Sequence, residues 1–230
     1  LTVILPYFPT GTMERIDHEG QIPTATTTCK LLSAIPLTAL GPPQVVVYDI
    51  HSLASRLQFA ESVVPRLDTA VPLLLDRLKT LPEEQKAALA IAFPDEGACK
   101  RFGRAFPKQY SVITCIKVRG PDGARHVTIK EGVPDGKHVV IVDDLVKTGG
   151  TLINCAKALR DAGAKSVSAY CTHAVFPQQS WRRFTDGLFE KFWVTDSCPS
   201  TIKELEGKAP FEVLSLSKCL AELLMVDLTR

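Results

Sequence analysis

Residues 138–163 constrain the fold of this chain more than any other stretch. Residues 139–142 are Val-Val-Ile-Val, a β-branched run that is too short for a helix and is typical of a central strand in a parallel sheet. Asp143 and Asp144 follow directly, and the small and hydroxyl-bearing residues 147–151 precede a helical pattern. This order predicts a strand, two acids at its carboxyl end, a loop and a helix, and open α/β sheets bind their ligands at such a point.

The loop and the two acids suit different halves of one ligand. Gly149 and Gly150 let the backbone close around a phosphate, and the following helix, residues 152–162 with Gly163 as C-cap, turns N–H dipoles toward it. The two carboxylates can accept hydrogen bonds from vicinal hydroxyls or hold a divalent cation. A sugar phosphate satisfies both halves. The alternative is a structural turn whose acids are solvated or cap the helix.

Composition excludes several functional classes. The 230 residues carry a net charge of +2, and no basic run interleaved with aromatics points to nucleic acid. No apolar stretch is long enough to span a bilayer, so no membrane partner is expected. The seven cysteines are dispersed without a CxxC pair, which favours reduced thiols that fill the core of a cytoplasmic protein over a zinc site. No signal peptide is seen, but organellar targeting stays open because the chain opens on Leu1.

Two further predicted strands also end in acidic residues. Strand 45–48 runs into Asp49 and His51, which strand alternation would put on the same side, facing one cation or phosphate; a satisfied structural histidine is the commoner case. Strand 87–93 runs into Asp95 and a helix that begins with basic residues, so backbone amides could hold a pyrophosphate while Asp95 reaches a metal. An ordinary helix start is the alternative, since it also favours Asp.

A fourth predicted strand, residues 111–118, is broken by the loop 120–124, with Lys117 and Arg119 at the break. Two cations there could close over a reacting phosphate and then release product, whereas a solvated edge hairpin is the alternative.

The overall pattern is that of an α/β protein with a domain boundary near Asp68, giving domains 1–68 and 69–230, the first beginning in mid-fold. The other predicted elements are strands at 1–5, 166–173, 192–195 and 211–216, helices at 24–35 (with Thr24 as N-cap), 73–81, 181–184 and 220–226, a loop at 10–20 and a proline-punctuated stretch at 64–72.

Taken together, the motifs resemble the ribose-phosphate pyrophosphokinase, or PRPP synthetase, family. They are Pro-Tyr-Phe-Pro at 6–9, Asp-Ile-His at 49–51, Pro-Asp-Glu-Gly-Ala-Cys-Lys-Arg at 94–101, Lys-Val-Arg at 117–119 and the Asp-Asp motif at 143. They occur in the family's order over nearly the whole chain, and the Thr-Gly-Thr-Met-Glu-Arg segment is most similar to the plant-type second class. The resemblance implies two phosphoribosyltransferase-type, Rossmann-like domains with parallel sheets, the first incomplete at its N-terminus.

The resemblance also implies an activity. A ribose-phosphate diphosphokinase uses Mg²⁺ to transfer the β,γ-diphosphoryl group of ATP to the 1-hydroxyl of ribose 5-phosphate, giving PRPP and AMP, and the family implies a homo-oligomer built from dimers, such as a hexamer. By position, the catalytic cations would be Lys117 and Arg119, and the metal contacts His51 and Asp95. The ribose 5-phosphate site would comprise Asp143, Asp144, Thr148, Gly149, Gly150 and Thr151, and the nucleotide or pyrophosphate contacts Arg15, Asp17, Asp95, Gly97, Lys100 and Arg101.

Some positions depart from the family pattern. Residues 12–14 are Thr-Met-Glu where the commoner class has an ATP-contacting Arg-Gln-Asp run, and Lys147 stands where many members carry an acid. Two other functions stay open. A salvage phosphoribosyltransferase shares the motif at 143 but does not explain the first domain or the pair Lys117 and Arg119. A non-catalytic regulatory subunit would be expected to lose the catalytic cations or the metal histidine, which this chain keeps.

Overall fold

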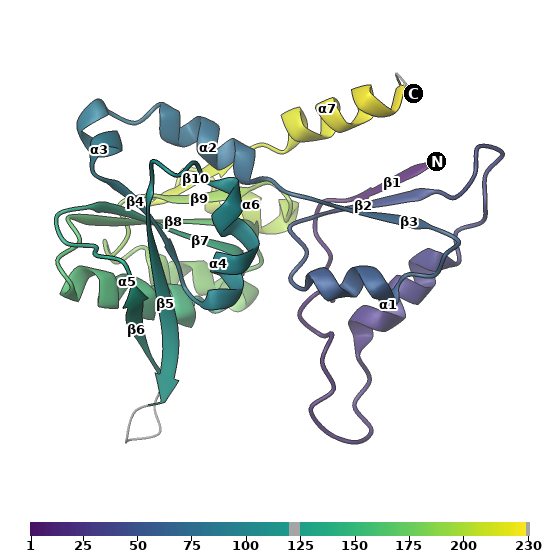
Figure 1. Ribbon diagram of the computed structural model, residues 1–230, viewed down its shortest axis with the longest axis horizontal. Coiled ribbons are helices and arrows are strands. Elements are labelled where there is room, and N and C mark those ends of the chain that lie inside the picture. The colour runs from purple at the N-terminus through teal and green to yellow at the C-terminus, as the bar shows by residue number, and fades with distance from the viewer. Residues whose placement is uncertain (120–124, 229–230) are drawn as a thin grey trace. The chain divides into compact units, whose positions relative to one another are not determined.

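The chain divides into two compact units, Leu1–Ala70 and Val71–Arg230. The computed structural model describes residues 1–119 and 125–228, and side chains over 1–118 and 126–225. The division falls two residues beyond the boundary suggested at Asp68. Each unit has its own β-sheet (Figure 1).

Unit 1 is built on a three-stranded parallel sheet. Its strand order is β1 (Thr2–Leu5), β2 (Gln44–Tyr48) and β3 (Val64–Asp68). Helix α1 (Thr24–Ser33) buries Ala25 and Cys29 in one core cluster with Val45 and Val47, which are two residues apart on β2 and so point to the same face. A short 3₁₀ segment, η1 (Leu53–Gln58), precedes β3.

Two predictions for unit 1 were incomplete or wrong. The proline-punctuated stretch at 64–72 contains the strand β3; Pro65 is tolerated because β3 is an edge strand of the described sheet. Thr24 is not the N-cap of α1, because the cap position is occupied by Pro23 and no side chain caps the helix. The Thr24 hydroxyl instead donates to Sδ of Met13 at 2.9 Å.

Unit 2 is built on a seven-stranded sheet with the order β10-β9-β8-β7-β4-β5-β6. All its strand pairs are parallel except β5 with β6. The strands are β4 (Leu89–Phe93), β5 (Ser111–Arg119), β6 (Arg125–Glu131), β7 (His138–Val146), β8 (Ser166–Ala174), β9 (Phe192–Thr195) and β10 (Phe211–Leu214). The helices are α2 (Val71–Lys79), α3 (Glu83–Ala87), α4 (Glu96–Phe102), α5 (Gly150–Asp161), α6 (Pro199–Leu205) and α7 (Ser217–Leu228), with 3₁₀ segments η2 (Gly103–Ala105) and η3 (Pro177–Phe184).

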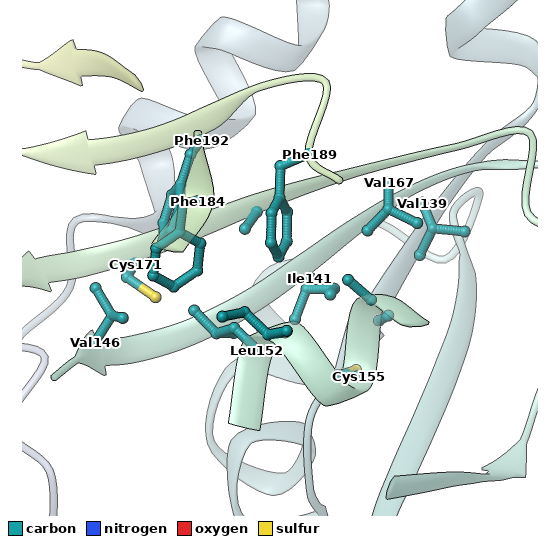
Figure 2. Close-up of a cluster of buried hydrophobic side chains, with 14 of the residues drawn as sticks. Val139, Ile141, Val146, Leu152, Cys155, Val167, Cys171, Phe184, Phe189 and Phe192 are labelled. Atoms are coloured by element: carbon teal, nitrogen blue, oxygen red, sulfur yellow. The ribbon is translucent and has the colours of Figure 1, made fainter. Parts of the chain in front are cut away.

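Buried side chains cover both faces of this sheet. Along β7, Val139 and Ile141 belong to a core cluster with α5, whereas Val140 and Val142 belong to a second cluster with α2 and α4. This alternation explains the continuous apolar run, since a strand covered on both faces has no polar side. Figure 2 shows the first cluster, in which Leu152 and Cys155 of α5 lie near Ile141 of β7. Burial of the run confirms β7 as a central strand.

The sheet order reverses between β4 and β7. The chain leaves β4 through α4 to reach β5 on one side, and leaves β7 through α5 to reach β8 on the other. Such a switch point opens a crevice beyond the carboxyl ends of the two strands. The strand β7 continues through the two acids as far as Val146, beyond the predicted end, because β8 pairs with it up to Ala174 while β4 pairs with it only to Ile141.

The strands β5 and β6 form an antiparallel ribbon at the edge of the sheet. Residues 111–114 of β5 pair with β4, and beyond them β5 pairs with β6 alone in the described chain. The backbone therefore matches the edge-hairpin alternative, while the predicted loop 120–124 and the side chain of Arg119 lie outside the described residues. Helices α3 and α6 were not predicted. No described helix is long and apolar enough to span a membrane.

Candidate functional site

Asp95 and Lys117 form an ion pair at the end of β4. One oxygen of Asp95, Oδ1, accepts a hydrogen bond from the backbone N–H of Ala98 at 3.0 Å and so caps α4. The other, Oδ2, accepts from Nζ of Lys117 at 3.2 Å. Both side chains are about two-fifths exposed, at 41% and 42%. The β5–β6 ribbon thus places a cation directly against the acid that begins α4.

The two acids of β7 differ in environment. Asp143 is half-buried, and its Oδ1 accepts a hydrogen bond from the backbone N–H of Asp144 at 2.9 Å. Burial first, and then the negative charge of Asp144, raises the pKa of Asp143 well above its usual range, and Asp95 adds to this effect. The Asp144 residue is 4% exposed and lies 3.5 Å from Nη1 of Arg101 on α4. Asp143 is therefore the more accessible of the two acids.

The segment η3 donates hydrogen bonds to the loop between β7 and α5. Gly149 has φ +77° at the N-cap position, and Gly150 is the first residue of α5. The Ser180 hydroxyl donates to the carbonyl oxygen of Lys147 at 2.7 Å, and Nη1 of Arg183 donates to that of Thr148 at 2.6 Å. Both hydrogen bonds from η3 therefore end on carbonyl oxygens of the loop. The sequence reasoning missed this support, although its donors stand three residues apart, about one turn, in a Ser-Trp-Arg-Arg-Phe run.

The other predicted residues of unit 2 lie around these groups. Thr148 is exposed and Thr151 is half-buried at the start of α5. Lys100 is 81% exposed on α4, with Nζ 4.0 Å from a Glu96 oxygen. Gly97 lies in the first turn of α4 close to the Asp95 carboxylate. Asp95, Lys117, Arg101 and the two acids of β7 are thus brought to one end of the sheet.

The remaining predicted site residues belong to unit 1. The exposed Arg15 pairs with Glu14 at 3.4 Å, and Asp17 is exposed in the loop before α1. His51 is exposed, whereas Asp49 is 3% exposed and its Oδ2 accepts from the backbone N–H of Ala70 at 2.9 Å. The expectation that Asp49 and His51 share one side was wrong, because Asp49 has φ +38° and strand geometry ends at Tyr48.

The described residues contain no group of three His, Cys, Asp or Glu side chains that would form a complete metal cage. Mg²⁺ is normally held by one or two carboxylates together with water and substrate phosphates, so this donor set still suits it. Asp95 supplies a partly exposed carboxylate, one oxygen of which accepts from the partly exposed Lys117. The chemistry of the site therefore fits a magnesium ion that arrives with a phosphorylated ligand.

Comparison with known proteins identifies the chain's relatives. Ribose-phosphate pyrophosphokinase 4 of Arabidopsis thaliana is 52% identical over 98% of this chain and 67% of the relative. The protein of the same name from Oryza sativa subsp. japonica is 50% identical over 98% of this chain and 70% of its own length. This chain belongs to the ribose-phosphate pyrophosphokinase family. The activity and the plant-type class expected from the sequence are confirmed at the level of this family.

Other matches agree with this assignment. The chloroplastic ribose-phosphate pyrophosphokinase 3 of Arabidopsis thaliana is 48% identical, and the chain covers 56% of it. The profile described as "Phosphoribosyl transferase domain" matches residues 96–187 of unit 2, which include α4 and the loop before α5. The crystal structure of phosphoribosylpyrophosphate synthetase from Mycobacterium smegmatis matches 99% of this chain and 71% of that chain with a TM-score of 0.79 at 22% identity. The α/β fold predicted for this pyrophosphokinase is therefore confirmed.

Proposed function

We propose that this pyrophosphokinase transfers the β,γ-diphosphoryl group of ATP to the 1-hydroxyl of ribose 5-phosphate and forms PRPP and AMP. The observation that carries the proposal is the ion pair of Lys117 with Asp95, which stands beside the acids of β7 at the switch point of the sheet. Group transfer between phosphates leaves a protein mainly positioning and charge stabilisation to perform. A cation, carboxylates and a glycine loop at one edge of the sheet provide both.

Ribose 5-phosphate would bind across β7 and the start of α5. The 5-phosphate would take the N–H groups of residues 148–151, since Gly149 and Gly150 keep side chains away from them. The ring hydroxyls would donate to the carboxylates of Asp143 and Asp144, with Asp144 held in place by Arg101. This places the 1-hydroxyl toward β4, where Lys117 can stabilise negative charge on the transferring group, and Arg119 would act with it.

Mg²⁺ and ATP would complete the site. When bound, the metal would neutralise the charge of the diphosphoryl group. Asp95 would hold it, and Gly97, Lys100 and Arg101 would contact the nucleotide or pyrophosphate. Asp95 accepts a hydrogen bond from Lys117, so metal binding to the same carboxylate would release Lys117 toward the substrate. The exchange of one cation for another on Asp95 would couple metal binding to the arrival of Lys117.

The proposal extends to assembly and location. We expect a homo-oligomer built from dimers, as the family suggests, and a reducing compartment, either the cytoplasm or an organelle. The structure describes none of the seven cysteines in a disulfide, which agrees with the reducing compartment. Relatives named as chloroplastic and mitochondrial keep an organellar location open for this protein.

The test is formation of PRPP and AMP from ATP, ribose 5-phosphate and Mg²⁺, compared between the wild type and Lys117→Ala. We expect about a hundredfold loss of kcat for this variant, which corresponds to ~2.7 kcal/mol of transition-state stabilisation. Its stability should change by less than ~1 kcal/mol, because both partners of the ion pair are about two-fifths exposed to solvent.

The matched control is Lys130→Ala. Lys130 on β6 pairs with Glu96, the residue next to Asp95, and its side chain is 44% exposed. The two variants therefore remove equivalent surface ion pairs from the same end of α4, and Lys130→Ala should keep the wild-type rate. Equal loss in both variants would contradict the role of Lys117. Folded wild-type protein that binds ribose 5-phosphate but forms no PRPP would favour the regulatory subunit, and PRPP consumption with a base would favour the salvage enzyme.

A further inference from the structure

Two buried thiols contact each other beneath the site. Sγ of Cys155 on α5 donates a hydrogen bond to Sγ of Cys115 on β5, and the two sulfurs are 3.4 Å apart. Both residues are fully buried in the same core cluster, where Figure 2 shows Cys155 below Leu152 and Ile141. Forty residues separate them in the chain. This contact therefore links two elements that the backbone ladder of the sheet does not join.

Each thiol stands next to part of the proposed site. Cys115 precedes Lys117 by two residues and lies at the register shift between Thr114 and Cys115, where β5 leaves β4 and continues with β6. The helix that carries Cys155 begins at Gly150, directly after the loop proposed for the 5-phosphate. A covalent bond between the two sulfurs would tie the strand that carries the catalytic cation to the helix that presents the sugar-phosphate loop.

We propose that Cys115 and Cys155 form a modification site at which a peroxide converts the two thiols into an intramolecular disulfide and a thiol reductant restores them. The consequence for catalysis rests on the proposed function, because it assumes that Lys117 acts on a ligand bound at the loop before α5. Disulfide formation itself does not depend on that function.

The two thiols differ in a way that sets the order of the chemistry. The hydrogen bond from Cys155 lowers the pKa of Cys115, and the same contact together with burial raises the pKa of Cys155 well above its usual range. The Cys115 thiolate attacks hydrogen peroxide, which yields a sulfenic acid and hydroxide. Sγ of Cys155 then attacks the sulfenic sulfur, losing its proton as water leaves. Two thiols and one peroxide thus give one disulfide and two waters.

Access to the buried sulfurs requires a local opening. The ribbon of β5 and β6 is the natural place for it, because residues 115–119 of β5 are paired on one side only in the described chain, and a register shift between Thr114 and Cys115 interrupts the ladder. The reaction should therefore be slow compared with that of an exposed thiol, and should stop at the disulfide because Cys155 already lies against Cys115.

Formation of the disulfide would shift the residues of the proposed site that β5 and α5 carry. The two sulfurs must approach from 3.4 Å to the bond length of about 2.05 Å, which moves β5 and α5 toward each other by roughly 1 Å unless side chains absorb the change. Misplacement of reacting groups by about 1 Å can cost ~100-fold in rate. We expect the oxidised protein to lose at least about tenfold in PRPP formation, and dithiothreitol to restore the rate.

The test uses the full chain and follows mass and rate together. The protein is treated with hydrogen peroxide, unfolded in the presence of an alkylating reagent and digested, and the peptides of Cys115 and Cys155 are sought as a linked pair. The variants Cys115→Ala and Cys155→Ala should each abolish that pair and protect the rate from peroxide. The control is Cys171→Ala, because Cys171 is equally buried in the same core cluster but is not part of the pair; this variant should respond to peroxide as the wild type does.

The linked pair decides the proposal even if a variant fails to fold, because it is measured on the wild type. Alkylation of both Cys115 and Cys155 after peroxide treatment would refute the proposed modification site. Oxidation confined to the more exposed Cys99 would refute it as well. A linked pair with an unchanged rate of PRPP formation would overturn the consequence for catalysis. A reduced wild type that forms no PRPP refutes the proposed function instead, while the mass measurement still accepts or rejects the disulfide.

Discussion

Replacement of Gly149 by alanine should destabilise unit 2, whereas the same replacement at the neighbouring Gly150 should not. Gly149 has φ +77°, a backbone conformation that strains any residue with a Cβ atom. A Cβ atom there would lie 2.5 Å from Cε2 of Phe184 and closer still to Cζ. Phe184 cannot easily move, because it is fully buried among the rings of Phe176, Phe189 and Phe192.

The expected cost has two parts. Left-handed backbone geometry costs a non-glycine residue about 1–2 kcal/mol. Forcing a methyl group against a packed ring adds ~1–3 kcal/mol of overpacking. We therefore expect Gly149→Ala to lower the free energy of unfolding by about 2–5 kcal/mol. Gly150→Ala is the matched control, since a Cβ atom at Gly150 meets nothing within 4 Å and the residue is helical, so this change should be neutral or stabilise by up to ~1 kcal/mol.

Urea unfolding followed by tryptophan fluorescence measures this cost for unit 2 alone. Both tryptophans of the chain, Trp181 and Trp193, lie in that unit. A double-mutant cycle with Phe184→Leu separates the two parts, because the smaller side chain removes the clash but not the backbone strain. A coupling energy of about 1–3 kcal/mol is expected. Equal stability of the Gly149→Ala and Gly150→Ala variants, or no coupling to Phe184, would refute the reasoning.

Two further predictions concern the acids of β7. Because the folded pKa of Asp143 is raised, its protonated form favours the folded state, so its contribution to stability falls as pH rises from the unfolded value of about 3.9 through the folded value. Binding of Mg²⁺ with ribose 5-phosphate should release the proton of the Asp143 carboxyl group. Calorimetry in buffers of different ionisation enthalpy measures this release, and binding heats that do not depend on the buffer would contradict it. Arg101→Met should leave the 4%-exposed Asp144 without its cation and lower unit 2 stability by ~3 kcal/mol in urea, and a change below ~1 kcal/mol would show that the ion pair is not needed.

Apolar runs in the sequence predicted most strands of the two sheets, because a strand buried on both faces is apolar along its whole length. The runs at β2, β4, β7, β8 and β9 were found within a few residues of their bounds. The strands β3 and β6 were not predicted, because β3 contains a proline and two charged residues and β6 contains four charged or hydroxyl-bearing residues, so both resemble loops. In β6 the alternation of Val127 and Ile129 with polar residues was a usable signal, since both pack against the core around α5.

The order of motifs predicted which residues to consider, but not how they meet. Lys117 and Asp95 are 22 residues apart, and their contact depends on β5 lying beside β4. The positive φ of Asp49 and its bond to the Ala70 N–H depend on how the chain leaves β2, which strand alternation does not encode. The pairing of Arg101 with Asp144 likewise requires α4 and β7 to be neighbours, so the fold had to be known first.

The ribbon of β5 and β6 also affects which amino-acid substitutions this protein tolerates. Figure 1 shows it reaching out from the sheet of unit 2, and beyond residue 114 β5 is held by a single described partner strand. A two-stranded ribbon is only marginally stable by itself, so its exposed positions, unlike Cys115, Val127 and Ile129, should add little to the folding of the domain. Substitutions at exposed positions such as Lys117 should therefore alter turnover while leaving cellular abundance almost unchanged. In a library of variants scored for both turnover and abundance, substitutions at exposed positions of the ribbon should lower turnover alone. Substitutions in the buried strand β7 should lower abundance.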